Sequence, residues 1–183
     1  RKMSKSLGNS PDILRLIDDY GADGTRFGVL ISSPAGNDLL FDEKLCEQGR
    51  NFGNKLWNAM KLVKSWSLNN KLGEQPDEAV RQRHQQSIAL FRSRLYATVE
   101  ALEANYERFR IADNLTQIYR LIWDEFCSQY LEWVKPGKQE VMDPETYEAT
   151  LAFFEELLKL LHPYMPFITE EIWHQLRERS DDD

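Results

Sequence analysis

The sequence predicts an all-α fold, a helical bundle that follows a short helical segment. Along four long stretches the apolar residues recur at steps of three and four, which is the spacing of one helix face. Asp42 and Asp143 stand as caps at the start of two of these stretches. No stretch reads convincingly as a strand. With 183 residues, 42% of them hydrophobic, the chain is long enough to bury one core.

The first 41 residues predict a loop and two short helical pieces. Ser10 is expected to cap a helix over residues 11–20, with Pro11 at its first helical position and Gly21 as its stop. The next piece, residues 22–31, contains two glycines, which weaken its prediction as a helix. A loop rich in turn-forming residues follows.

The bundle begins with a helix over about residues 43–66, which Asp42 caps. Its apolar stripe consists of Leu45, Gly49, Phe52, Leu56, Met60 and Val63. A second stripe, about one residue round the axis, is polar. It carries long cationic side chains and amides that can donate to phosphates or base edges. Asparagine is a poor helix former. Helix propensity therefore does not explain Asn51, Asn54 and Asn58, which fall within two turns, and their presence indicates a role for this face.

Three further long helices and one short helix complete the prediction. A connection over residues 67–76 leads to a helix from Asp77 to about Arg108, and Asp113 or Asn114 starts the next one, which Val134 ends. Because its apolar residues run nearly all round, we expect this helix to be the central, most buried element. The last two helices start at Asp143-Pro144 and at Thr169. The predicted domains are residues 1–41, residues 42–178 and an acidic tail, residues 179–183.

The bulk numbers exclude some classes of protein and leave others open. No apolar run approaches a membrane span of about 20 residues, nothing resembles a leader peptide, and the two cysteines and three histidines are too scattered for a metal site. We therefore expect a reduced, cytoplasmic compartment and no metal. The net charge of −7 argues at first against nucleic acid. Its acidity lies in residues 139–183, so a surface that faces RNA in the first two thirds is neither excluded nor supported.

The first nine residues are the most informative motif. Lys2 and Lys5, with Ser4 and Ser6 between and after them, form a cationic loop that suits phosphate groups. The string Lys2-Met3-Ser4-Lys5-Ser6 resembles the KMSKS motif of class I aminoacyl-tRNA synthetases.

Four further stretches are similar to class Ia synthetases, the valyl, isoleucyl, leucyl and methionyl group. They are residues 51–59, 123–132, 160–173 and 32–43, in matching order and spacing, and the last of them looks most like the valyl branch. The resemblance covers nearly the whole chain and implies the anticodon-binding bundle of such an enzyme, in a piece of a longer protein that would be inactive alone. The parent would join valine to ATP, with Mg²⁺, and transfer it to valine tRNA. We expect a monomer with no membrane partner and no ligand bound to this piece by itself.

The resemblance also implies which residues act. Those expected at the ATP phosphates are Lys2, Met3, Ser4, Lys5 and Ser6. Those expected at the anticodon arm are Lys44, Gln48, Asn51, Lys55, Asn58 and Lys61. ATP and valine would also need upstream domains.

Other residues have simpler interpretations. We expect Trp57, Trp123, Trp133 and Trp173 to belong to the core rather than to stack on bases, and His162 to be a buried helix-end group. Glu170 and Glu171 are expected to complement a helix dipole, and both cysteines to act as small hydrophobes. Two alternatives stay open at this point. One is the same region of an isoleucyl or leucyl enzyme, and the other is a non-catalytic helical module that binds proteins.

Overall fold

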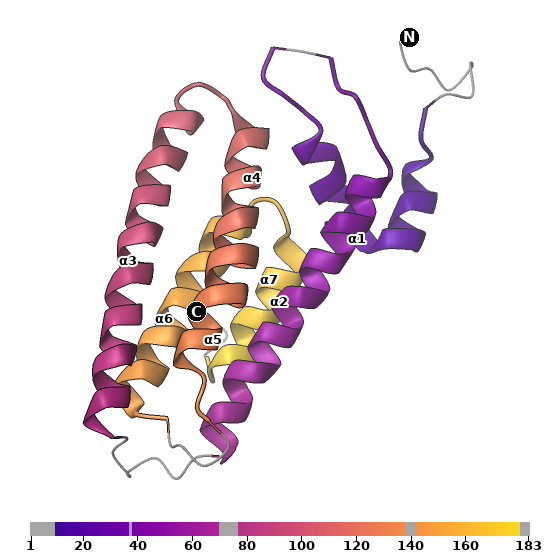
Figure 1. Cartoon of the computed structure of the whole chain (residues 1–183). Coiled ribbons are helices and arrows are strands. Elements are labelled where there is room, and N and C mark those ends of the chain that lie inside the picture. Colours follow the sequence, from indigo (N-terminus) through magenta and orange to yellow (C-terminus); the bar gives the residue numbers. More distant parts are fainter. Residues whose placement is uncertain (1–9, 37, 70–76, 138–141, 180–183) are drawn as a thin grey trace.

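The computed structural model describes residues 10–36, 38–69, 77–137 and 142–179, and its regular structure there is entirely helical, which confirms the predicted all-α class. The successive bundle helices run in alternating directions, and α1 lies at one end, against the first half of α2 (Figure 1). The elements are α1 (Ile13–Ile31), α2 (Lys44–Asn69), α3 (Glu78–Tyr106), α4 (Ile111–Arg120), the π-helix η2 (Leu121–Tyr130), α5 (Leu131–Val134), α6 (Pro144–Leu161) and α7 (Pro166–Leu176).

The first helix differs from its prediction. The two expected pieces form one element, α1, with a kink at Gly21, whose φ of 77° and ψ of 165° are not helical. Asp12, not Ser10, is the N-cap, because its side chain accepts a hydrogen bond of 3.0 Å from the Leu14 amide. Aspartate caps as well as serine does, so the prediction of Ser10 as the cap was wrong by two residues.

Glycines let α1 and α2 approach very closely. A Cβ atom on Gly28 would lie 2.5 Å from Cys46 Sγ and 2.7 Å from the Cys46 amide nitrogen. One on Gly49 would lie 2.7 Å from Phe27 Cβ and 2.9 Å from the Gly24 carbonyl oxygen. Gly24 and Gly28, which weaken the helix prediction, are therefore present for packing between helices.

Two side chains of α1 hold the turn between α6 and α7. The Asp23 carboxylate accepts from the backbone amides of Phe167 at 3.3 Å and Ile168 at 2.6 Å. Arg26 donates to the carbonyl oxygens of Tyr164 at 3.1 Å and Pro163 at 2.9 Å. Burial raises the pKa of Asp23, although the two amide hydrogen bonds act in the opposite direction. This carboxylate caps α7 from outside the helix.

Three predictions near this turn are wrong. The last helix begins at Pro166 rather than Thr169, so Glu170 and Glu171 lie beyond its first turn and do not face the dipole as expected. Glu170 instead pairs with His174 at 3.0 Å. His162 is exposed rather than buried, and its Nδ1 lies 2.8 Å from Thr169 Oγ1.

The helix predicted to be central starts earlier than expected and contains a π-helical section. It begins at Ile111, because Asn114 is not a cap but a buried side chain whose amide donates to the Leu102 carbonyl oxygen at 3.1 Å. Its inner residues are at most 1% exposed, and they are Leu115, Ile118, Leu121, Ile122, Phe126, Tyr130, Leu131 and Val134. Rings of Phe126 and Tyr130 meet Phe91 of α3 at 5.4 and 5.0 Å, so this helix carries the centre of the core.

The other helix starts follow the sequence. The side chains of Asp42, Asp77 and Asp143 accept hydrogen bonds from the first-turn amides of α2, α3 and α6. Asp143 is buried, and its second oxygen lies 3.4 Å from Nδ1 of the buried His84. This contact joins the start of α6 to α3.

The close contact between α1 and α2 makes a stability prediction. Gly28→Ala places a methyl group against backbone atoms that cannot rotate away, so we expect it to lower the free energy of unfolding by about 1–3 kcal/mol. Gly53→Ala, also in α2, is the matched control, because its Cβ would meet only side-chain atoms at 3.8 Å or more. That change should be neutral or add about 0.5–1 kcal/mol through helix propensity. Urea unfolding followed by circular dichroism distinguishes the two, and equal effects would contradict the packing argument.

The Asp143 cap predicts a dependence of stability on pH. Burial raises the pKa of this carboxyl, but hydrogen bonds from Thr146 and His84 outweigh it and hold the pKa below its usual value. A lowered folded-state pKa stabilises the fold above the unfolded value of about 3.9, and this contribution is lost as pH falls through the folded value.

We therefore expect Asp143→Ala to cost about 1–2 kcal/mol at neutral pH. The difference from wild type should shrink in unfolding experiments below about pH 4. Asp77→Ala removes an exposed cap without a buried histidine partner and should cost less at neutral pH. A difference for Asp143→Ala that stays constant from pH 7 to pH 2.5 would exclude this explanation.

Candidate nucleic-acid interface

The polar face predicted on the first bundle helix is present on α2. Lys44, Asn51 and Asn58 are exposed, whereas Gln48 and Lys55 are partly buried. With about 100° of rotation per residue, these five positions fall within an arc of about 80°. They therefore share one flank of the helix, which we call the α2 flank.

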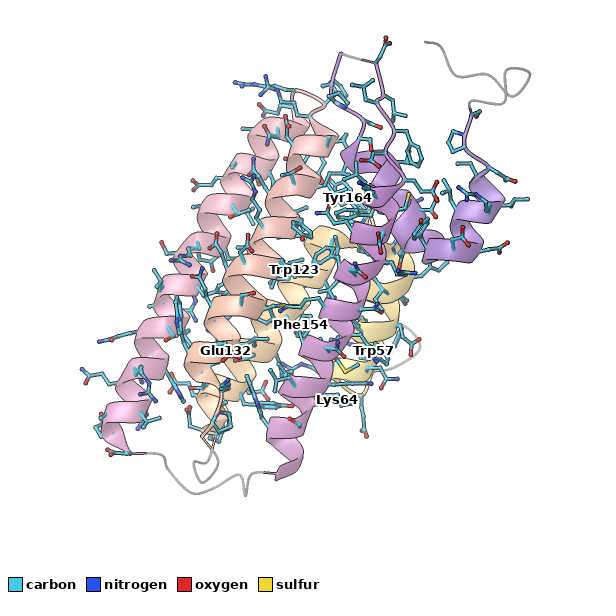
Figure 2. The ribbon with its side chains drawn as sticks, turned by 45° about the vertical axis from the view of Figure 1, so that its right-hand side comes forward. Trp57, Lys64, Trp123, Glu132, Phe154 and Tyr164 are labelled. Atoms are coloured by element: carbon cyan, nitrogen blue, oxygen red, sulfur yellow. The ribbon has the colours of Figure 1, made fainter. Side chains whose placement is uncertain are left out.

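Lys61, the sixth predicted residue, lies elsewhere. It is exposed but stands about 100° round the axis from Lys44, and its ammonium lies 5.7 Å from the centre of the Trp57 ring. Nearby, Lys64 donates to the Gln175 carbonyl oxygen of α7 at 2.6 Å. In Figure 2, Trp57 and Trp123 lie on opposite sides of α2. The structure thus brings five of the predicted residues together and separates the sixth.

An aromatic wall borders the α2 flank. The Lys55 ammonium lies 5.3 Å from the centre of the Trp123 ring in η2. That ring stacks on Tyr119 of α4, with centroids 5.6 Å apart and planes at 25°. Phe52 of α2 meets Tyr119 edge-on at 4.9 Å from the buried side. A cation beside fixed aromatic rings can stabilise the fold through a cation–π contact, and it can also bind a nucleotide, whose base stacks on a ring while the cation contacts its phosphate.

The tryptophans are therefore less buried than predicted. Trp57, Trp123 and Trp173 pack on the rim of the core and stay partly accessible, while Trp133 is 37% exposed. Trp66, which the sequence analysis did not single out, is the buried one. The four-residue step from Tyr119 to Trp123 could have indicated a paired aromatic face. Sequence alone could not show that Lys55 lies across from it.

The α2 flank carries two lysines and no acid, and its exposed amides have no protein partner among the described residues. Residues 44–66 contain five basic side chains and one acidic one, in a chain of net charge −7. The exposed amides of Asn51 and Asn58, and that of Asn54 about 40° beyond Asn58, form no side-chain hydrogen bond with any residue that the structure describes. Groups of this kind donate to phosphates, riboses and base edges. The α2 flank can therefore bind an anionic strand without first breaking its own contacts.

The remaining candidate chemistry is weaker. Burial raises the pKa of the Cys127 thiol to about 12 against the opposing charge of Lys55, so the thiolate, which is the nucleophilic form, is disfavoured at neutral pH. Within the described ranges, no three His, Cys, Asp or Glu side chains gather as metal ligands would. No described helix is long and apolar enough to cross a membrane.

The residues expected at the ATP phosphates precede the part of the chain that the structure describes. Lys2, Met3, Ser4, Lys5 and Ser6 lie outside the described residues.

Two family models match different parts of the chain. Residues 89–182 match the anticodon-binding domain of tRNA ligase. Residues 1–42 match the class I tRNA synthetases of the isoleucine, leucine, methionine and valine group.

Similar proteins cover the whole chain. A valine--tRNA ligase of Christiangramia forsetii is 54% identical over 100% of this chain, and one of Parabacteroides distasonis is 50% identical over 99%. A more distant one, from Chlorobaculum tepidum, is 38% identical over 98%. In the first two of these the matched region is 20% of the relative, so the chain spans about a fifth of the length of the curated relatives it matches.

A solved structure has the same fold. It is a LeuRS of Agrobacterium radiobacter in a ternary complex with tRNA and LeuAMS. It superimposes with a TM-score of 0.64 and 22% sequence identity, over 98% of this chain and 21% of that one. At this identity the match concerns the arrangement of the helices.

Proposed function

The chain belongs to the class I tRNA synthetases, and on that premise we propose that it is the anticodon-binding part of a valine–tRNA ligase. The family membership rests on the anticodon-binding model, which matches more than half of the chain, and agrees with the resemblance drawn from the sequence. Relatives about 50% identical over the whole chain carry the name valine--tRNA ligase, which supports valine as the amino acid.

The observation that carries the proposal is the α2 flank. Lys44, Asn51 and Asn58 are exposed there, and Lys55 lies against the stacked Tyr119–Trp123 wall, in a chain whose net charge is −7. Lys44 and Lys55 would neutralise phosphates of the anticodon arm. Gln48, Asn51 and Asn58 would donate to or accept from unpaired bases, which proteins read along their edges. Lys61, about 100° round the helix from Lys44, would contact a second part of the backbone.

The rest of the proposal concerns the longer enzyme. Lys2, Met3, Ser4, Lys5 and Ser6 would stabilise the phosphates of ATP, with Mg²⁺, while valine and ATP are joined. The products would be AMP, diphosphate and valyl-tRNA. The valine pocket and nucleotide fold would lie in the four fifths of such a ligase that this chain does not span, so the chain alone should bind tRNA without catalysing a reaction. We place the enzyme in the cytoplasm, as a monomer.

Binding of tRNA by the purified chain tests this function. We expect a valine tRNA transcript to bind more tightly than the same transcript with an altered anticodon, and both affinities to fall with salt. Lys55→Ala should weaken cognate binding up to about tenfold and reduce the salt slope by about one, as the loss of one phosphate contact does. Fluorescence anisotropy across a salt series measures both quantities.

Arg83→Ala is the matched control. Arg83 is an exposed cation of α3 and not part of the α2 flank, so its loss should leave anticodon discrimination unchanged. If the two transcripts bind equally and Lys55→Ala behaves as wild type, the α2 flank does not read the anticodon.

A further inference from the structure

The turn between α3 and α4 has an unusual residue at its tightest point. The Arg110 amide donates to the Asn105 carbonyl oxygen at 2.9 Å, and the Phe109 amide donates to that of Tyr106 at 3.0 Å. These two bonds define a Schellman motif, in which the residue at the Phe109 position takes a left-handed conformation and is usually glycine. Phe109 has a φ of 55°, and no other non-glycine residue that the structure describes has a positive φ.

Folding gains little from this side chain. The Phe109 ring is 81% exposed and stacks on no other ring in the described ranges. A left-handed conformation is unfavourable for a residue with a Cβ atom, whereas glycine adopts it freely. An exposed, strained aromatic residue therefore costs stability where glycine would not, and such strain is found where a side chain has a function.

The turn itself is held firmly. The hydroxyl of Tyr106 lies 2.8 Å from that of Tyr164, which is buried beside α1 and α7. Figure 1 shows the turn at the end of the bundle where the chain enters α2, at the start of the helix that carries Trp123. The ring of Phe109 is thus presented on a fixed support.

Charged neighbours indicate the kind of partner. Arg108 and Arg110, on either side of Phe109, are exposed and form no side-chain hydrogen bond or ion pair with any residue that the structure describes. The acids next to them, Glu107 and Asp113, are exposed and pair with neither. An aromatic ring between two unpaired guanidinium groups can bind a single-stranded nucleotide, because the base stacks on the ring and the arginines contact the phosphates.

We propose that Phe109 stacks on an unpaired nucleotide of the bound tRNA, and that Arg108 and Arg110 hold the phosphates beside it. This second contact rests on the proposed function for its partner, but it uses a different element from the α2 flank. Because two acids lie nearby, the aromatic stack contributes more to this contact than net charge does.

Phe109→Gly separates function from stability. Glycine fits the left-handed position, so the variant should unfold a few degrees higher than wild type, roughly 2–4 °C for a chain of this size. Removal of a stacked ring should weaken binding of the valine tRNA transcript about tenfold. Phe109→Trp keeps a ring and should bind as wild type. Arg108→Gln with Arg110→Gln should lower the salt slope.

Tyr96→Ala is the matched control. It removes an aromatic ring of α3 that is 63% exposed, without a strained backbone, and should leave tRNA affinity unchanged. If Phe109→Gly binds the transcript as tightly as wild type while Lys55→Ala binds it weakly, the turn does not contact tRNA and the proposed function stands. If wild type itself shows no binding, both proposals are wrong. A lower unfolding temperature for Phe109→Gly would show that the ring serves the fold, which also overturns the inference.

Discussion

The close approach of α1 to α2 is the constraint on which the rest of the structure depends. Because Gly28 and Gly49 carry no side chain, the backbone of one helix meets the other directly at Cys46 and Phe27. This contact orients α1, and α1 in turn carries Asp23 and Arg26 to the turn between α6 and α7. The segment that follows the KMSKS motif and the bundle thus form one packed body, and the α2 flank faces outward because the opposite side of α2 is covered.

Much of the fold could be predicted because it depends on local chemistry. The acids at 42, 77 and 143 lie at helix starts, where an oxygen satisfies free amides, and such pairs are close in sequence. The predictions fail where the deciding contact is distant. Asn114 looks like a cap in sequence but serves a carbonyl group of the preceding helix, and the cap of α7 comes from α1. The π-helix has no local pattern that would distinguish it from the α-helix on either side of it.

The candidate interface divides in the same way. Helical spacing places Lys44, Asn51 and Lys55 on one flank, because rotation along a helix is regular. The same rotation separates Lys61 from them by about 100°, so helical geometry alone excludes it from this flank, and the structure adds that its ammonium lies beside Trp57. Helical spacing could not show that Lys55 faces Trp123 of another helix. The prediction for Phe109 fails for another reason. In the sequence it continues the apolar spacing of α3, which predicts a packed residue, yet it lies beyond the end of the helix and is 81% exposed. A bulky residue gives no sign in sequence that it occupies a position typical of glycine.

The clamp made by Asp23 and Arg26 has a consequence for how the chain is synthesised. Its partners lie 137 to 145 residues further along the sequence. At about 5–20 residues per second, α1 leaves the ribosome roughly 7–30 seconds before the turn that it holds. During that interval the acid and the arginine have none of these backbone groups to bind, so α1 reaches its final contacts only after α6 and the turn that follows it have been made.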